Sequence, residues 1–120
     1  KLPVLFVCED NDLSILTPVA VRRAWKVANV AKAMGVDAVE ITDDPWTIMQ
    51  RAAAHKGGLP FLMNIYVCRM NWHVSAGTDG PPEWDRYGAV KKTLKKLGLA
   101  KKAQELEAAE KEKAEKLWRE

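Results

Sequence analysis

Three apolar segments alternate with two helical segments along this chain, and that alternation constrains the fold most strongly. Residues 3–8, 38–41 and 59–68 are apolar runs with the length and composition of β-strands. Between them, apolar residues recur at helical spacing over 18–34 and 45–53. The order strand–helix–strand–helix–strand predicts an α/β fold, with a parallel sheet and flanking helices.

Local signals predict where these helices begin and end. Thr17–Pro18 and Asp44–Pro45 each combine an N-cap residue with a proline at the first helical position. Gly35 is expected to end the first helix in the left-handed conformation, which glycine adopts most easily. The sequence therefore predicts one continuous helix from Pro18 to Gly35 and a second that begins at Pro45.

The apolar patterns also predict burial. The uninterrupted run over 3–8 is typical of a strand covered on both faces. Trp25 and Trp46 lie on helix faces and are expected in the core. Three strands make a thin sheet, so we expect further strands from an upstream segment or a partner.

The chain changes character after residue 82. Glycines and prolines over 71–82 predict a loop. From Glu83 onward, the pattern predicts two helices that are separated near Gly98. We therefore expect a partial α/β domain over 1–82 and a helical tail over 83–120.

The formal net charge of +3 lies in the predicted tail. Lys and Glu alternate there at helical spacing, as in Glu107–Lys111, Glu112–Lys116 and Glu115–Arg119. Such pairs are typical of a solvated helix and do not favour nucleic-acid binding. One local exception is a cluster of four lysines: Lys91, Lys92, Lys95 and Lys96.

The composition also bears on the compartment. The sequence contains no run of 18 apolar residues, so no membrane span is predicted. Cys8 and Cys68 both lie in apolar runs, and we expect two free, buried thiols rather than a disulfide framework. A cytoplasmic or organelle-matrix location follows from that expectation.

Several catalytic motifs do not occur in this sequence. It has no P-loop, no GxGxxG after a strand, no GxSxG and no HExxH, and neither His55 nor His73 has metal-ligand spacing. What remains is Asp10–Ile15 and Arg69–His73, each at the end of a predicted strand. Ligands bind beyond the carboxyl ends of parallel strands, and carboxylate and amide oxygens suit Mg²⁺. We therefore expect a ligand site where these two segments converge.

Four segments resemble one known family in the order in which they occur. They are CEDNDLSILTP (8–18), AVEITDDP (38–45), LPFL (59–62) and VCRMNWH (67–73). They resemble, in turn, the CENNxYxISTP, VxVDGNDP, GPTLIE and YRxxGHS segments of the alpha subunit of thiamine-diphosphate-dependent 2-oxo acid dehydrogenases. That family includes the pyruvate, branched-chain 2-oxo acid and acetoin enzymes. The tail, LKKLGLA followed by a Glu-rich helix, is similar to the family's last segment.

This resemblance implies a site for thiamine diphosphate and Mg²⁺. Asn11 falls on the asparagine that binds Mg²⁺, and Leu13 on the residue whose backbone carbonyl completes the metal site. Ile15 falls on the bulky residue that props thiamine diphosphate in a bent form. His73 falls on the catalytic loop histidine near the diphosphate.

The sequence also departs from the family pattern. Asp10 replaces an amide, Leu16 a small hydroxyl residue and Trp72 a glycine. The family's GDG stretch, which supplies an aspartate metal ligand, does not occur in this sequence. We therefore expect the chain to contribute only part of one cofactor site.

Each implied site residue has a simpler alternative. Asn11 can complete a turn and cap a helix, as Asn and Asp side chains often do. Ile15 can be an ordinary core residue, and His73 an exposed loop residue.

As a function, the resemblance implies oxidative decarboxylation of a 2-oxo acid, with acyl transfer to a lipoyl carrier. The expected partners are the upstream segment of the alpha subunit, a beta subunit and a lipoyl acyltransferase. Two alternatives stay open. The chain can be a non-catalytic structural or interaction module that retains the fold, or a small binding domain that uses Lys91–Lys96 against an acidic partner.

Overall fold

A computed structural model describes residues 2–55, 58–71 and 82–119 of the chain. The chain divides into two compact units, Lys1–Trp84 and Asp85–Glu120. Each unit is described by itself below. Two residues discussed above lie outside the described residues: His73, the implied catalytic histidine, and Trp72, which replaces a glycine of the family pattern.

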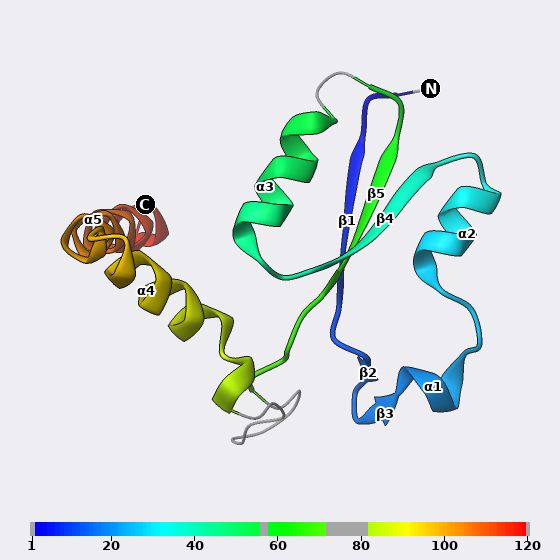
Figure 1. Ribbon diagram of the computed structural model, residues 1–120, viewed down its shortest axis with the longest axis horizontal. Coiled ribbons are helices and arrows are strands. Elements are labelled where there is room, and N and C mark those ends of the chain that lie inside the picture. The colour runs from blue at the N-terminus through cyan, green and yellow to red at the C-terminus, as the bar shows by residue number, and fades with distance from the viewer. Residues whose placement is uncertain (1, 56–57, 72–81, 120) are drawn as a thin grey trace. The chain divides into compact units, whose positions relative to one another are not determined.

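The first unit is a mixed α/β structure (Figure 1). Its elements in chain order are β1 (Leu5–Asp10), β2 (Leu13–Ser14), β3 (Thr17–Pro18), α1 (Val19–Arg22), α2 (Val27–Ala33), β4 (Asp37–Thr42), α3 (Pro45–Ala54), β5 (Phe61–Tyr66) and the 3₁₀ helix η1 (Pro82–Trp84).

The predicted parallel sheet is confirmed. β5 lies in the middle and pairs in parallel with both β1 and β4. Phe61 is therefore opposite Leu5 on one side and Asp37 on the other, and Tyr66 is opposite Asp10 and Thr42. The strands end together, which brings three carboxyl ends to one edge of the sheet.

Two small cores form on the two faces of the sheet, because side chains alternate along a strand. On one face, Ala28 and Ala31 of α2 pack with Ala38 of β4. On the other face, the buried residues Ile41, Met63 and Ile65 pack against α3. Figure 1 shows α2 and α3 on opposite sides of the strands.

The expected burial of the first strand is wrong. Phe6 and Val7 of β1 are 48% and 54% exposed. β1 is an edge strand here, and α2 packs on β4 and β5 rather than on β1. The tryptophans are also more exposed than predicted, at 56% for Trp25 and 41% for Trp46.

The predicted continuous helix over 18–34 is also wrong. Thr17 and Pro18 pair with β2 in a small antiparallel hairpin instead of capping a helix. The helix is then interrupted between α1 and α2, where Arg23 and Lys26 have extended backbones, with φ values of −149° and −106°. At this interruption the Arg23 side chain contacts Asp10 of β1.

The other helix signals are confirmed. The Asp44 side chain accepts a hydrogen bond from the Thr47 amide at 2.9 Å, and Pro45 is the first residue of α3. Gly35 follows α2 with a φ of +76°, in the left-handed region that glycine adopts at helix ends.

The second unit contains two helices, α4 (Arg86–Lys96) and α5 (Ala100–Arg119). They are separated as predicted at Gly98, whose φ is +72°. The Glu107 carboxylate of α5 accepts a hydrogen bond from the Tyr87 hydroxyl and pairs with Lys91 at 3.3 Å. In the part of the chain that the structure describes, no helix has the length and apolar character needed to cross a membrane.

Candidate functional site

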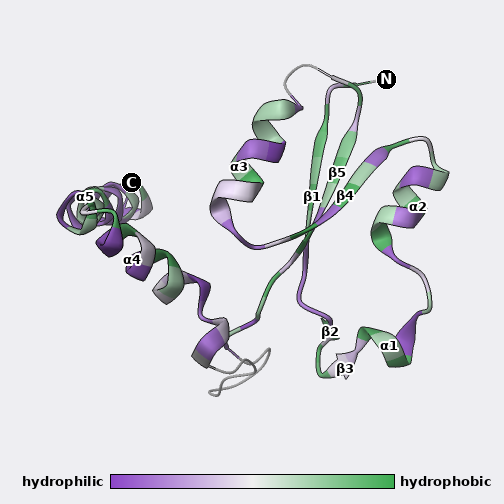
Figure 2. Ribbon diagram, viewed as in Figure 1, coloured by the Kyte–Doolittle hydropathy of each residue, from purple (hydrophilic) through white to green (hydrophobic). Residues whose placement is uncertain are grey.

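One face of the sheet changes from apolar to polar toward the carboxyl ends of its strands. On the face that α2 covers, the first cross-strand row is Phe6, Leu62 and Ala38. The next row is Cys8, Asn64 and Glu40, and the last includes Asp10 and Tyr66. β1 shows this change clearly in Figure 2, where its carboxyl end is hydrophilic. These polar residues therefore lie at the edge where the sequence predicts a ligand site.

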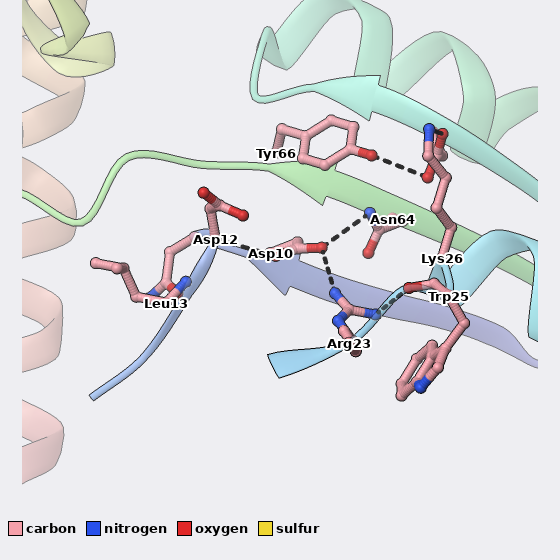
Figure 3. A network of polar contacts seen from close by, with 10 residues as sticks. Asp10, Asp12, Leu13, Arg23, Trp25, Lys26, Asn64 and Tyr66 are labelled. Atoms are coloured by element: carbon pink, nitrogen blue, oxygen red, sulfur yellow. Dashed lines mark hydrogen bonds and ion pairs between the residues drawn. The ribbon is translucent and has the colours of Figure 1, made fainter. Parts of the chain in front are cut away.

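Asp10 is the centre of a network of polar contacts at this edge (Figure 3). Its Oδ2 pairs with Arg23 Nη2 at 3.1 Å and accepts a weaker hydrogen bond from Asn64 Nδ2 at 3.4 Å. Its Oδ1 accepts a hydrogen bond from the Asp12 amide at 3.1 Å. The Arg23 and Asp10 side chains are only 10% and 11% exposed, so solvent weakens this ion pair far less than it weakens a pair on the surface.

Arg23 has further contacts within its own segment. Its Nη1 donates to the Trp25 carbonyl at 3.4 Å, and its guanidinium carbon lies 4.4 Å from the centre of the Trp25 ring. Two buried atoms of the network, Arg23 Nε and Asn64 Oδ1, have no hydrogen-bond partner among the described residues.

A second group of polar contacts lies beside the first. The Tyr66 hydroxyl donates to Glu40 Oε1 at 2.9 Å, and Lys26 Nζ pairs with Glu40 Oε2 at 3.2 Å. The hydrogen bond from Tyr66 is the main reason that the pKa of Glu40 is lowered. Burial, followed by the hydrogen bond to Glu40, raises the pKa of Tyr66.

These two groups line a cavity of about 270 Å³. Its walls combine charged side chains with the aromatic rings of Trp25 and Tyr66. Cys8 comes from the same face of the sheet, and burial is the main reason that the pKa of its thiol is raised. A raised pKa disfavours the thiolate, which is the nucleophilic form of cysteine.

The loop after β1 carries the predicted metal ligands. The Asn11 Oδ1 accepts a hydrogen bond from the Leu13 amide at 3.1 Å, which makes an Asx turn. Asp12 has a φ of +60°, a conformation that Asp tolerates better than most residues. The Asp12 carbonyl accepts from the Val19 amide at 2.8 Å, so this loop is tied to the start of α1.

Ile15 lies at the tip of the hairpin formed by β2 and β3. Ser14 pairs with Thr17, so Ile15 and Leu16 form the two-residue turn. Ile15 has a φ of +56°, which is rare for a β-branched residue, and is 56% exposed. Its carbonyl accepts a hydrogen bond from Arg69 Nη2 at 2.7 Å. The alternative of ordinary core packing for Ile15 is therefore wrong.

The contact between Arg69 and Ile15 confirms that the two predicted segments meet at this edge of the sheet. The position of His73 relative to them lies outside the described residues. Sequence reasoning missed Arg23 and Asn64, which complete the Asp10 network. The available signal was Asp10 itself, because a carboxylate at the end of a strand needs a counter-charge when it is buried.

The loop leaves oxygen atoms suited to a hard cation. Asn11 Oδ1 has two lone pairs, of which the Leu13 amide uses one. Leu13 and Pro18 form a non-hydrogen-bonded pair between the Ser14–Thr17 pair and the bond from the Val19 amide to the Asp12 carbonyl, so the Leu13 carbonyl points away from β3. Among the described residues, no three His, Cys, Asp or Glu side chains gather as a metal site. A cation here would therefore depend on amide and carbonyl oxygens, with further ligands from outside these residues.

The lysine cluster of the tail is partly engaged within its own unit. Lys91 pairs with Glu107 at 3.3 Å, and its ammonium lies 4.4 Å from the centre of the Tyr87 ring. Lys95 and Lys96 occupy the last turn of α4, where positive charge is favourable to a helix. Lys91 therefore has a structural role within the helix pair.

No protein-family model, curated protein or solved structure matches this chain.

Proposed function

We propose that this chain is part of the alpha subunit of a thiamine-diphosphate-dependent 2-oxo acid dehydrogenase. The segment Asn11–Ile15 carries the proposal, because its geometry suits the roles that the resemblance implies for it. It follows the carboxyl end of a strand in a parallel sheet, where ligands of α/β proteins bind. The segment offers two oxygens for a cation and then exposes an aliphatic side chain.

Asn11 and Leu13 would hold Mg²⁺, through the amide Oδ1 and the backbone carbonyl. The Asx turn supports this role, because it fixes the Asn11 side chain while one lone pair of Oδ1 is still available. An uncharged ligand pair would bind Mg²⁺ weakly by itself, since Mg²⁺ is usually bound through carboxylates and phosphates. The diphosphate and a carboxylate from the upstream segment would supply the remaining ligands.

Ile15 would position the cofactor. An aliphatic wedge has to be exposed and rigid. The Ile15 side chain is 56% exposed, and the Ile15 carbonyl accepts a hydrogen bond from Arg69, which restrains the turn. A backbone held in a rare conformation is a feature of functional sites, because the surrounding structure must maintain it. Thiamine diphosphate would supply a carbanion and an electron sink for decarboxylation of the 2-oxo acid.

The remaining parts of the enzyme are expected from other chains or segments. A beta subunit and the upstream segment would complete the cofactor site, and a lipoyl acyltransferase would receive the acyl group. His73, which the resemblance places near the diphosphate, would assist that transfer.

Two contacts favour a second candidate, a non-catalytic module that retains the fold. Asn11 already has a local role in the Asx turn, and Asp10 is neutralised by Arg23 instead of facing a cation. Both contacts are what a purely structural loop would also need.

Calorimetry with thiamine diphosphate and Mg²⁺ separates these candidates. We expect Mg²⁺-dependent binding by the chain together with the upstream segment and the beta subunit that would complete the site. Asn11→Ala should weaken this binding by roughly tenfold or more, because a metal ligand is lost. Asn29→Ala, at an exposed position of α2, is the matched control and should not change it. Absence of binding, both for the chain alone and with its partner, would exclude the enzyme.

A further inference from the structure

We infer that Arg23 is the positioning residue of the Asn11–Leu13 loop and acts on it through Asp10. The identity of the loop's ligand rests on the proposed function, whereas the mechanical role of Arg23 rests on the contacts alone. Arg23 touches neither Asn11 nor Leu13 in any contact described above. It reaches them through a single carboxylate.

The two oxygens of Asp10 connect Arg23 to the loop backbone. Oδ2 pairs with Arg23 Nη2 at 3.1 Å, and Oδ1 accepts from the Asp12 amide at 3.1 Å. The guanidinium thus sets the orientation of the carboxylate, and the carboxylate sets the position of the Asp12 amide. Asp12 is the residue between the two proposed metal ligands.

Arg23 is itself held in place. Its Nη1 donates to the Trp25 carbonyl, its guanidinium carbon lies 4.4 Å from the centre of the Trp25 ring, and its side chain is 10% exposed. A planar guanidinium makes these contacts in one fixed geometry, which an ammonium group cannot reproduce. The interruption between α1 and α2 is what brings this side chain to β1.

The charge of Arg23 matters as much as its shape. Asp10 is 11% exposed, and a carboxylate so far buried is strongly destabilised if its partner is removed. Without Arg23, the carboxylate would turn toward solvent or toward a cation on the loop, and the Asp12 amide would lose its acceptor. Arg23 therefore keeps Asp10 out of the cation's reach and leaves coordination to Asn11 and Leu13.

The test uses the full chain with four variants. Arg23→Met removes both the positive charge and the planar guanidinium donors. Arg23→Lys keeps the charge but not the planar group. Asp10→Asn in the Arg23→Met background removes the unpaired charge but keeps an oxygen for the Asp12 amide. Its new amide group can also donate to Asn64 Oδ1, which is buried without a partner among the described residues. Arg22→Met, at the exposed neighbouring position, is the matched control.

The first readout is amide hydrogen exchange at Asp12 and Leu13, measured by NMR. Arg23→Met should accelerate this exchange by about tenfold, Arg23→Lys by less, and the double variant should return to within about threefold of wild type. The amides of Ile41 and Ile65, in the paired strands β4 and β5, should keep their protection and so separate a local change from unfolding. Unchanged exchange in Arg23→Met, an equal change in Arg22→Met, or no rescue in the double variant would overturn the inference. If Arg23→Met does not fold, Arg23→Lys decides on the same criterion.

The second readout is Mg²⁺-dependent binding of thiamine diphosphate, measured by calorimetry with the upstream segment and the beta subunit present. Affinity should fall by about tenfold in Arg23→Met and recover in the double variant. If wild type does not bind, the proposed function fails, and the exchange rates still decide the role of Arg23. If wild type binds and Arg23→Met binds equally well, the positioning role is refuted while the proposed function stands.

Discussion

Ile15 combines an exposed side chain with a strained backbone, and glycine substitution separates the two. Its φ of +56° lies where a β-carbon is unfavourable, and its side chain is 56% exposed. Leu16 is its neighbour in the same turn, is 59% exposed and has no positive φ. We predict that Ile15→Gly destabilises the protein much less than Leu16→Gly.

The magnitude follows from three terms. Glycine lowers the free energy of unfolding by about 0.5–1 kcal/mol through its unfolded-state entropy. Loss of a half-buried aliphatic side chain lowers it by about 1 kcal/mol, since full burial contributes about 1.5–3 kcal/mol. Both terms apply almost equally to Ile15 and Leu16. Relief of the left-handed backbone, about 1–2 kcal/mol, applies only to Ile15. Ile15→Gly should therefore be nearly neutral, and Leu16→Gly should be about 1–2 kcal/mol worse.

Urea unfolding of wild type and both variants, followed by circular dichroism, measures this difference. Equal losses of stability in the two variants would show that the Ile15 backbone is not strained. In the proposed enzyme, Ile15→Gly should also weaken cofactor function although the fold is retained, because the aliphatic wedge is gone.

Two further predictions concern local contacts of the first unit. The pKa of Glu40 is lowered mainly by the hydrogen bond from Tyr66. The ionised Glu40 therefore stabilises the fold fully above its ordinary pKa of 4.5, and this stabilisation is lost as the pH falls through the lower pKa of the folded state. Tyr66→Phe should therefore lower the free energy of unfolding by about 0.5–1 kcal/mol at pH 7 and by less in acid, measured by urea unfolding at both pH values; an equal loss at both would contradict the assignment. At the start of α3, Asp44→Ala should cost about 1 kcal/mol, whereas Asp44→Asn, which keeps an oxygen for the Thr47 amide, should retain most of the stability. Thermal unfolding of Asp44→Ala and Asp44→Asn measures the difference in their stability, and similar melting temperatures for the two variants would refute the capping role.

The site illustrates the limits of local patterns. That the segments after β1 and β5 meet follows from the order of strands and helices, because parallel strands end at the same edge. The hydrogen bond from Arg69 to Ile15 agrees with that expectation. The Asp10 network depends instead on Arg23, which the spacing of apolar residues placed within a continuous helix. Periodicity describes which face of a helix is apolar, and it does not report that a charged partner elsewhere competes with helix formation.

The sequence alone determined the features that depend on a few adjacent residues. Asp44 and Pro45 begin α3, and Gly35 and Gly98 end α2 and α4, because capping and left-handed backbones are local properties. The alternation of segments also determined the parallel sheet. Only the tertiary structure decided that β5 is central and that β1 is an exposed edge strand, because these depend on pairing between distant segments. The same is true of the break at Arg23, whose side chain pairs with Asp10 of β1, a contact between distant segments that helical periodicity does not report.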